Sequence, residues 1–311
     1  MRPPDGYSVR PATEDDIDAI DALGQAYDFW ELGQADSFRE QLVDDFHTSG
    51  FDPARDTWYV TDADADADGD LAAFVLYKDR QPGEEGSQGF GRVHPEHHGR
   101  GLGAFLVDAV DRRWLEADAP RQDLLRHWLN AGDRSAAALL GSRGYQLVRR
   151  KFHLERSLAE LQAAVVPPGI EVRPIRAGEE RTLHRVNEES FAEHWGFSPA
   201  AFDEWRTMFA ALFEAEMVWV ADEAGELVGE LLLQVQGDRG WVEMLGVLPG
   251  WRGRGIGRAL LRTGFAELAR HGCGQALLGV DAGNESGALR LYESEGMTVS
   301  REWHVVEKRL G

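Results

Sequence analysis

Apolar and polar residues in the second half of the chain follow the periods of strands and helices in turn. Residues 170–175 alternate with a period of two, which is typical of a strand. Residues 181–191 place Leu183, Val186, Asn187 and Ser190 at helical spacing, and residues 199–213 show a second amphipathic pattern. The remainder predicts strands at 217–221, 227–235 and 241–247, a helix at 257–271, a strand at 276–280, a helix at 286–295 and two strands within 297–309. This order predicts a mixed α/β (α+β) fold, with a mostly antiparallel sheet flanked by helices.

The first half of the chain repeats this plan. The segments at 6–11, 98–103 and 144–147 recur at 169–174, 252–257 and 296–299, in the same order and at offsets of 163, 154 and 152 residues. A single match among Gly- and Arg-rich segments is easily accidental, but three in order indicate an internal duplication. Residues 165–169, Val-Val-Pro-Pro-Gly, interrupt the pattern between the copies. We therefore predict two tandem domains, residues 1–162 and 169–311.

Composition narrows the class of protein. Of the 311 residues, 43% are hydrophobic, which is enough for two cores. The formal net charge of −21 disfavours nucleic acid and anionic membranes as partners and favours cationic small molecules, although net charge also serves solubility alone. There is no apolar run of about 18 residues and no apolar signal core at the N-terminus, so we expect a cytoplasmic protein. The single cysteine, Cys273, cannot form an internal disulfide and is interpreted as a packing residue.

A strand, a glycine-rich turn and a helix follow one another over residues 241–261. Gly253, Gly255 and Gly257 let backbone N–H groups approach a phosphate, and the start of the helix adds the positive end of its dipole. Arg252 and Arg254 add cationic charge. The turn lacks the Gly-Lys-Ser/Thr of a Walker loop, and it follows the fourth strand rather than the first, which argues against a dinucleotide fingerprint. The segment therefore predicts a pyrophosphate site.

Residues 241–261 also resemble the acyl-CoA-binding motif of the GCN5-related N-acetyltransferase (GNAT) superfamily, through the strand, Val-x-Pro, Arg-x-x-Gly-x-Gly and a helix with Leu-Leu. Residues 284–297 resemble the superfamily's second signature, which has an Asn, a helix with Leu-Tyr and then a Gly. The resemblance covers the whole second half and, more faintly, the first. It implies acetyl-CoA as the acyl donor and direct transfer of the acetyl group to an amine, without an acyl-enzyme.

The resemblance assigns roles to residues of the second half. The backbone of the turn holds the pyrophosphate, through Arg252, Gly253, Arg254, Gly255, Ile256 and Gly257. The preceding strand separates from its neighbour at Leu245, Gly246 and Val247, where it binds the pantetheine arm and directs a backbone N–H at the thioester carbonyl. Asn284 binds pantetheine or orders its loop. Tyr292 stands where the family has the acid that protonates the departing thiolate, with a packed aromatic residue as the alternative.

A general base is also needed, because an amine is protonated at neutral pH and must lose a proton before it attacks. Glu243 is the leading candidate, since the family layout places it on the strand beside the thioester. Glu230, on the neighbouring strand, is second. Glu230, His194 and Trp195 are candidates for the lining of the acceptor pocket. An exposed or ion-paired side chain is an equally good interpretation of the carboxylates and the histidine.

The first half keeps the glycine-rich turn but not the chemistry. A candidate second acyl-CoA site consists of Val93, Arg100, Gly101, Leu102 and Gly103. Counting along the repeat, Leu140 stands for Tyr292, Gly132 for Asn284 and Gly89 for Glu243. We therefore expect a degenerate first domain, which is non-catalytic, and a catalytic second domain. This tandem plan resembles mycothiol synthase and related bacterial tandem proteins of the superfamily, although no specific acceptor-binding motif matches.

One segment outside these motifs has some features of a calcium-binding loop. Asp and Ala alternate over residues 62–70, but a calcium loop would need Glu at its twelfth position, where the chain has Ala73. A solvated hairpin loop is the better interpretation, and we expect no metal. The sequence thus predicts an N-acetyltransferase that uses acetyl-CoA and a small, cationic amine acceptor. The alternative is a non-catalytic acyl-CoA sensor or regulatory protein, which would not need the acid Tyr292.

Overall fold

The computed structural model describes residues 1–33, 35, 38–63, 70–80, 86–117, 124–195, 197–283 and 287–309. By its internal contacts the chain divides into two compact units. The first unit comprises Met1–Arg149 together with Trp303–Gly311, and the second comprises Arg150–Glu302. The acidic segment 64–69 and Asn284 lie outside the described residues.

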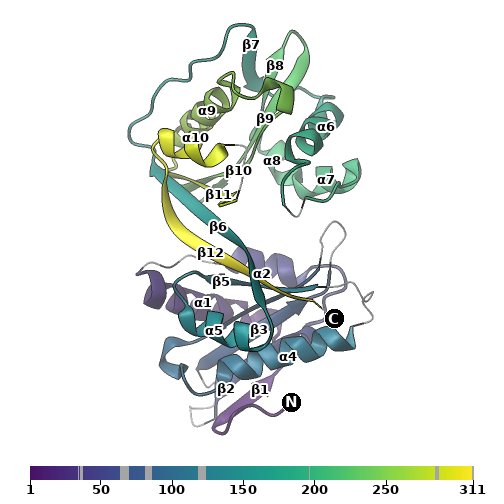
Figure 1. Ribbon diagram of the computed structural model, residues 1–311, viewed down its shortest axis with the longest axis vertical. Helices are drawn as coiled ribbons and strands as arrows, with labels where there is room; N and C mark the ends of the chain where they lie inside the picture. Colours follow the sequence, from purple (N-terminus) through teal and green to yellow (C-terminus); the bar gives the residue numbers. More distant parts are fainter. Residues whose placement is uncertain are drawn as a thin grey trace. The chain divides into compact units, whose positions relative to one another are not determined.

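The first unit is built on a mixed sheet with strand order β1-β2-β3-β4-β5-β12. Neighbouring strands are antiparallel except β4 and β5, which are parallel. Helices α4 and α5 pack on one apolar cluster of this sheet, and α1 and α2 pack on another (Figure 1). The elements are β1 (Tyr7–Arg10), η1 (Glu14–Asp16), α1 (Ile17–Leu32), α2 (Arg39–Phe46), α3 (Pro53–Asp56), β2 (Thr57–Asp62), β3 (Leu71–Lys78), β4 (Ser87–Val93), η2 (Pro95–His97), α4 (Leu102–Glu116), β5 (Leu124–Asn130), α5 (Arg134–Ser142) and the beginning of β6 (Gln146–Ser157).

The second unit has the corresponding strand order β6-β11-β10-β9-β8-β7, in which only β10 and β11 of the described pairs are parallel. Helices α9 and α10 pack on one apolar cluster of its sheet, and α6, α7 and α8 pack on another (Figure 1). The elements are β7 (Ile170–Pro174), α6 (Glu180–Phe191), α7 (Phe202–Met208), α8 (Ala210–Glu214), β8 (Val218–Glu223), β9 (Glu226–Gln236), β10 (Arg239–Val247), η3 (Pro249–Trp251), α9 (Ile256–Arg270), β11 (Gln275–Asp281), α10 (Ala288–Ser294) and the beginning of β12 (Thr298–Arg309). The predicted mixed, mostly antiparallel architecture is confirmed.

Two local expectations are wrong. The helix expected over 199–213 is broken at Phe209, which leaves the helical region at φ −103° and ψ 17° and separates α7 from α8. The two strands expected within 297–309 are one continuous strand, β12. Hydrophobic periodicity cannot distinguish one long strand from two short ones, because both alternate with a period of two.

The long strands β6 and β12 explain why the compact units differ from consecutive halves of the sequence. Residues 303–309 of β12 pair with β5 in the first unit, from Trp303 opposite Asn130 to Arg309 opposite Leu124. Residues 151–157 of β6 pair with β11 in the second unit. Each copy of the repeat therefore completes its sheet with a strand segment from the other copy, whereas the predicted division at 163–168 follows the repeat itself.

Candidate functional site

The turn after β10 has a backbone that depends on glycine. Gly253 and Gly255 adopt φ of 75° and 86°, in the left-handed region that a Cβ disfavours. Gly255 is the N-cap of α9, a helix of 15 residues. Successive backbone N–H groups in such a turn form a concave anion site, and the start of α9 adds its dipole. The turn thus has the geometry that a pyrophosphate site requires.

The two arginines of this turn have different contacts. The Arg252 Nε donates to the Val247 carbonyl at the end of β10 (3.1 Å), and one of its terminal nitrogens donates to the Ser190 carbonyl in the last turn of α6 (2.9 Å). Its other terminal nitrogen is 3.4 Å from Glu193. Arg254 stacks on Trp251 and donates to the Gly250 carbonyl within the turn. The Arg252 side chain therefore joins the turn to α6, and its backbone N–H donates to the Pro249 carbonyl.

Strand β10 separates from β11 well before it ends. The parallel pairing extends only from Arg239 opposite Gln275 to Trp241 opposite Leu277, although β10 continues to Val247 and β11 to Asp281. On its other edge, β10 remains paired with β9 as far as Val247 opposite Gly229. Residues 242–247 consequently have one backbone edge that pairs with no strand of the described part of the chain. Leu245, Gly246 and Val247 lie on this stretch, beside the glycine-rich turn.

Glu243 lies where β10 is irregular. The register between β9 and β10 shifts between Val242 and Met244, so Glu243 is the extra residue of a bulge. Its side chain is exposed, and it makes no ion pair or hydrogen bond with another described side chain. Partial desolvation by the surrounding protein nevertheless raises the pKa of its carboxyl. A bulge redirects a side chain, and this one leaves the Glu243 carboxylate unpaired.

Glu230 differs from Glu243 in its surroundings. It lies on β9 with 0% of its surface exposed, and burial raises the pKa of its carboxyl to about 8. Asn187 of α6 donates to Oε1 over 2.8 Å. Across the strand pair, Glu230 is opposite Gly246 of β10. The sequence analysis placed Asn187 and Ser190 at helical spacing with Leu183 and Val186 but did not assign them to the site, although polar residues on the apolar side of an amphipathic helix were a signal.

Tyr292 lies on α10 and is 7% exposed. It belongs to the same apolar cluster as Val280 of β11 and Ile256 of α9, and Leu245 and Val247 of β10 pack against that cluster. Burial raises the pKa of the phenol to about 12, so it is protonated at neutral pH. Within the described ranges the hydroxyl has no hydrogen-bond partner. The phenol is therefore available as a proton donor on the side of the sheet where β10 is open.

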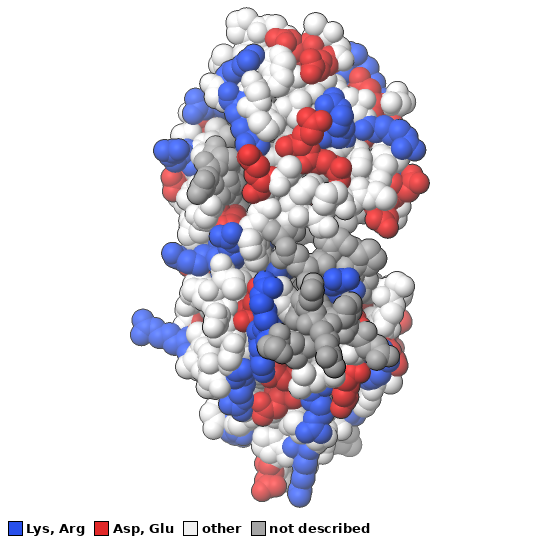
Figure 2. All heavy atoms as spheres, turned by 45° about the vertical axis from the view of Figure 1, so that its right-hand side comes forward, with Lys and Arg blue, Asp and Glu red and all other residues white. Residues whose placement is uncertain are grey.

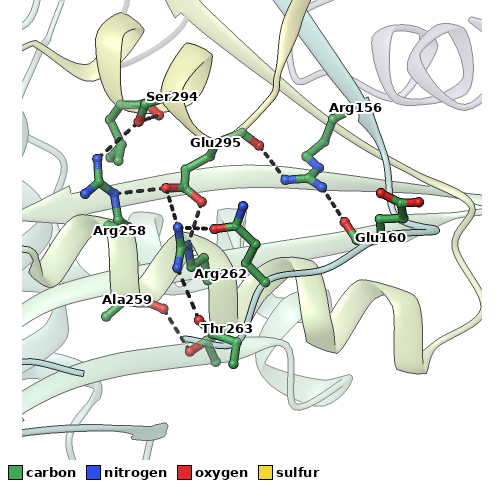
Figure 3. Close-up of polar contacts among 11 residues, drawn as sticks. Arg156, Glu160, Arg258, Ala259, Arg262, Thr263, Ser294 and Glu295 are labelled. Carbon is green, nitrogen blue, oxygen red and sulfur yellow. Dashed lines mark hydrogen bonds and ion pairs between the residues drawn. The ribbon is translucent and has the colours of Figure 1, made fainter. Parts of the chain in front are cut away.

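A network centred on Glu295 holds the short helix α10 against α9. Figure 3 shows the buried Glu295 carboxylate between Arg258 and Arg262, which approach it to 2.9 and 2.7 Å. Arg258 also donates to the Ser294 hydroxyl, and Arg156 of β6 donates to the Glu295 backbone carbonyl. A helix of seven residues has little stability by itself. These contacts, which the motif analysis did not anticipate, therefore fix the helix that carries Tyr292.

The remaining candidates surround the end of β10. His194, in the loop after α6, is half-buried, and its ring contacts that of Phe191 at 4.7 Å. Desolvation and the nearby Arg252 lower the pKa of its imidazole. Trp195 beside it is also half-buried. The second unit thus brings Glu230, Gly246, Val247, Arg252 and His194 to one corner, while Tyr292 approaches β10 from the α9 side.

The first unit repeats the backbone of this site with different side chains. Strands β4 and β5 pair only from Ser87 opposite Leu125 to Gly89 opposite His127, and then separate. A Cβ at Gly89 would lie 2.3 Å from the His127 ring, so no side chain can stand where the second unit has Glu243. Leu140, the counterpart of Tyr292, is buried in the core. Asp133, next to the Gly132 that was matched with Asn284, caps α5 and accepts a hydrogen bond from Tyr27.

Comparisons with known proteins agree with this geometry. A family model described as Acetyltransferase (GNAT) family matches the chain twice, over residues 23–144 and 181–297. The mycothiol acetyltransferase of Streptomyces griseus is 32% identical over 243 residues, which cover 74% of each chain. That of Catenulispora acidiphila is 29% identical over 306 residues, which cover 93% of this chain and 94% of the relative.

Solved structures share the same plan. A GCN5-related N-acetyltransferase from Sphaerobacter thermophilus matches with a TM-score of 0.85 and 30% identity, over 99% of this chain and 97% of that one. A tandem GNAT protein from the clavulanic acid biosynthesis pathway matches with a TM-score of 0.71 and 16% identity, over 98% and 99% of the two chains. At that identity the second likeness concerns the fold alone.

Proposed function

The chain belongs to the acetyltransferase (GNAT) family, and we propose that its second unit transfers an acetyl group from acetyl-CoA to the amine of a small-molecule acceptor. Acetyl-CoA is the acyl donor of this family. The relatives named mycothiol acetyltransferases support a small molecule as the acceptor. They also favour catalysis over the alternative of an acyl-CoA sensor, since their names are those of enzymes.

The residues present fit an acyl-CoA donor. The turn from Arg252 to Gly257 offers backbone N–H groups and the start of α9 to the pyrophosphate. The open edge of β10 at Leu245, Gly246 and Val247 offers backbone groups to the pantetheine arm and an N–H to the thioester carbonyl. Asn284 is proposed to bind the same arm.

The observation that carries the proposal is the open edge of β10 with a buried, protonated Tyr292 on the adjoining apolar cluster. The donor supplies an activated acetyl group and a thiolate leaving group. Tyr292 gives its proton to the departing sulfur, and Glu243 receives the proton that the acceptor amine releases, directly or through one water. The raised pKa of Glu243 brings its basicity closer to that of the amine. Glu230, His194 and Trp195 are proposed to line the acceptor pocket.

The first unit is proposed to be non-catalytic. Leu140 cannot donate a proton, and His127 fills the space where Glu243 would have its counterpart. The turn after β4 nevertheless keeps Gly99 and Gly101 in the left-handed region, with φ of 76° and 85°. A second acyl-CoA site at Val93 and residues 100–103 is consistent with this backbone. The proposed domains therefore have unequal roles, with chemistry in residues 169–311 and a supporting role for residues 1–162.

The test is acetyl-CoA-dependent release of CoA with a panel of primary amines, using wild type and Tyr292→Phe. We expect acceptor-dependent release that falls at least about tenfold in the variant, because the phenol supplies the proton of the leaving group. Tyr145→Phe is the matched control, since Tyr145 is a buried tyrosine of the first unit whose hydroxyl donates to Asp111. Acetyl-CoA binding without release on any amine would contradict the proposal, and equal release by wild type and Tyr292→Phe would remove Tyr292 from the mechanism.

A further inference from the structure

A cavity of about 240 Å³ lies in the first unit between α2 and the sheet. Phe38, the N-cap of α2, and Leu42 line it from the helix side, while Leu76 of β3 and Phe90 of β4 line it from the sheet. Small-molecule sites measure roughly 300–1,000 Å³ and have mostly apolar walls with a few polar groups. This cavity is slightly smaller, so it suits a small ligand with an apolar body.

The cavity is separate from the candidate acyl-CoA site of the same unit. It reaches β4 where that strand is still paired with β5, as far as Gly89, whereas the candidate site lies beyond their separation at Val93 and residues 100–103. Leu42 and Leu76 belong to the apolar cluster on which α1 and α2 pack. The helix that the glycine-rich turn opens, α4, packs on the other cluster. The cavity is therefore a second place in this unit where a ligand can bind.

A buried ion pair lines the cavity. Nζ of Lys78 on β3 donates to Oδ1 of Asp45 on α2 over 2.7 Å, and the two side chains are 17% and 8% exposed. Gln41 donates to the same carboxyl oxygen over 3.2 Å. Among the described residues, Oδ2 of Asp45 has no hydrogen-bond partner, and the three N–H donors of Lys78 have no acceptor besides Asp45. Both charged groups can therefore form further hydrogen bonds with a ligand.

The second unit replaces this cation with a neutral side chain. Phe74 of β3 corresponds to Glu230 of β9, because each pairs with the residue before the last of the next strand. Four residues further along each strand, Gln234 stands for Lys78. On the helix side, Trp205 of α7 is 3% exposed and fills the apolar cluster beneath α6, α7 and α8. The charged cavity is therefore specific to the first unit and is not part of the plan that the two units share.

We infer that this cavity binds an apolar α-amino acid in its zwitterionic form. The ligand carboxylate accepts hydrogen bonds from Lys78, its ammonium group donates to Oδ2 of Asp45, and its side chain contacts the apolar wall at Leu42 and Phe90. A zwitterion carries one charge of each sign, so it complements the ion pair at both ends. A simple carboxylate would instead lie against Asp45, and a simple amine against Lys78, with like charges close together.

Burial distinguishes this ion pair from the charges at the surface. On the face drawn in Figure 2, Lys and Arg side chains are interspersed with Asp and Glu, and exposed charges are screened by salt. Charges shielded from water interact with a ligand much more strongly than exposed ones. Recognition of both charged ends of the ligand is therefore assigned to Asp45 and Lys78.

The test is a calorimetric titration of the full chain, without acetyl-CoA, with three related probes. These are L-leucine, isocaproate, which lacks the ammonium group of leucine, and isoamylammonium, which lacks its carboxylate. We expect the wild-type protein to bind leucine at least about tenfold more tightly than either analogue, because each analogue loses one charge-assisted hydrogen bond and meets a like charge. Equal affinity for leucine and either analogue, or no leucine binding at millimolar concentrations, would overturn the inference.

Two variants locate the binding. Lys78→Gln should weaken the binding of leucine and isocaproate at least about tenfold and spare isoamylammonium, whereas Asp45→Asn should weaken leucine and isoamylammonium and spare isocaproate. A purely structural ion pair would affect the three probes alike, which would contradict the inference. Arg143→Gln is the matched control, because Arg143 pairs with Asp108 on the surface of the same unit. Leucine binding that is equal in wild type and both variants would place the ligand elsewhere and would also overturn the inference.

A measurement on the wild-type protein covers the case in which a variant fails to fold. An amine-directed reagent labels lysines, and mass spectrometry compares Lys78 with Lys151 in the same sample. We expect leucine to lower the labelling of Lys78 relative to Lys151, because the ligand carboxylate covers the Lys78 ammonium. An unchanged ratio at a leucine concentration that saturates the calorimetric signal would contradict the proposed site.

Discussion

The glycine-rich turns of the two units have nearly the same backbone and different side-chain contacts. Gly99 and Gly101 match Gly253 and Gly255 in φ to within one degree, and each turn opens a helix of 15 residues. His98 reaches the carbonyl that ends β4 through its Nε2, at 3.1 Å from Val93, as Arg252 reaches that of Val247. The comparison teaches that a phosphate-binding backbone can persist where the side chains for chemistry are absent.

The side chains beyond the turn account for the difference. Arg252 extends past the strand end to the Ser190 carbonyl of α6, whereas the shorter His98 packs edge-to-face with Trp30 of α1, with ring centroids 4.7 Å apart. The second unit thereby joins α6 to its turn through hydrogen bonds. The first unit joins α1 to its turn through aromatic contacts. In this fold, the backbone of the glycine-rich turn is therefore the same in both units while the side chains around it differ.

The largest effect is expected from matched glycine substitutions that test whether the two turns have different roles. In Gly253→Ala and Gly99→Ala, the new Cβ meets no atom within 4 Å, so both variants bear only the cost of a left-handed backbone, about 1–2 kcal/mol. Gly253→Ala should also lower kcat/KM for acetyl-CoA at least about tenfold, because the glycine-rich turn shifts and its backbone N–H groups lose their alignment with the pyrophosphate. Gly99→Ala should leave it unchanged. Urea unfolding and steady-state kinetics would measure both, and equal loss of activity would show that the first turn contributes to turnover.

A smaller effect is expected when Arg252 of the second unit is replaced with histidine, the residue that the first unit has at the corresponding position, His98. Arg252→His should keep the contact with Val247 and lose that with Ser190, so α6 is held less firmly. We expect the KM for the acceptor to rise about threefold to tenfold, with the KM for acetyl-CoA nearly constant, since one charge-assisted hydrogen bond is lost. The reverse pattern, a raised KM for acetyl-CoA alone, would show that the guanidinium binds phosphate.

The smallest effect concerns how the free energy of unfolding depends on pH because of the buried Glu230 carboxyl. The first unit has Phe74 at the corresponding strand position. The pKa of Glu230 is raised from 4.5 to about 8 by burial, so the folded state holds a proton that the unfolded state releases above pH 4.5. Stability therefore falls as the pH rises from 4.5 to about 8, and changes no further from this group above that. The free energy of unfolding of Glu230→Gln should therefore fall less than that of wild type between pH 4.5 and pH 8. Urea unfolding at both pH values measures this, and a difference between the two proteins that ignores pH would contradict it.

Local patterns of the sequence determined the tandem plan, the order of most elements and the glycine-rich turns. The reason is physical, because apolar periodicity reports which face of an element is buried, and a left-handed turn requires glycine whatever surrounds it. The same patterns predicted Gly253, Gly255 and Tyr292 as site residues and identified Glu230 and Glu243 as candidates. The ranking of Glu243 before Glu230 came from the family layout, and the sequence could not show how their surroundings differ, since burial of Glu230 and the bulge at Glu243 depend on the strands and helices beside them.

Only the tertiary structure decided which strands are neighbours and which polar groups remain without partners. The sequence of a strand indicates which of its faces is buried but not which strand it pairs with. The pairing of β12 with β5 of the first unit could therefore not be predicted from local patterns. The contacts of Glu295 with Arg258 and Arg262 join α10 to α9 through residues far outside the reach of local sequence patterns. The hydrogen bond between Asn187 of α6 and Glu230 of β9, and the close approach of both elements to Gly246 of β10, are likewise properties of the packed fold.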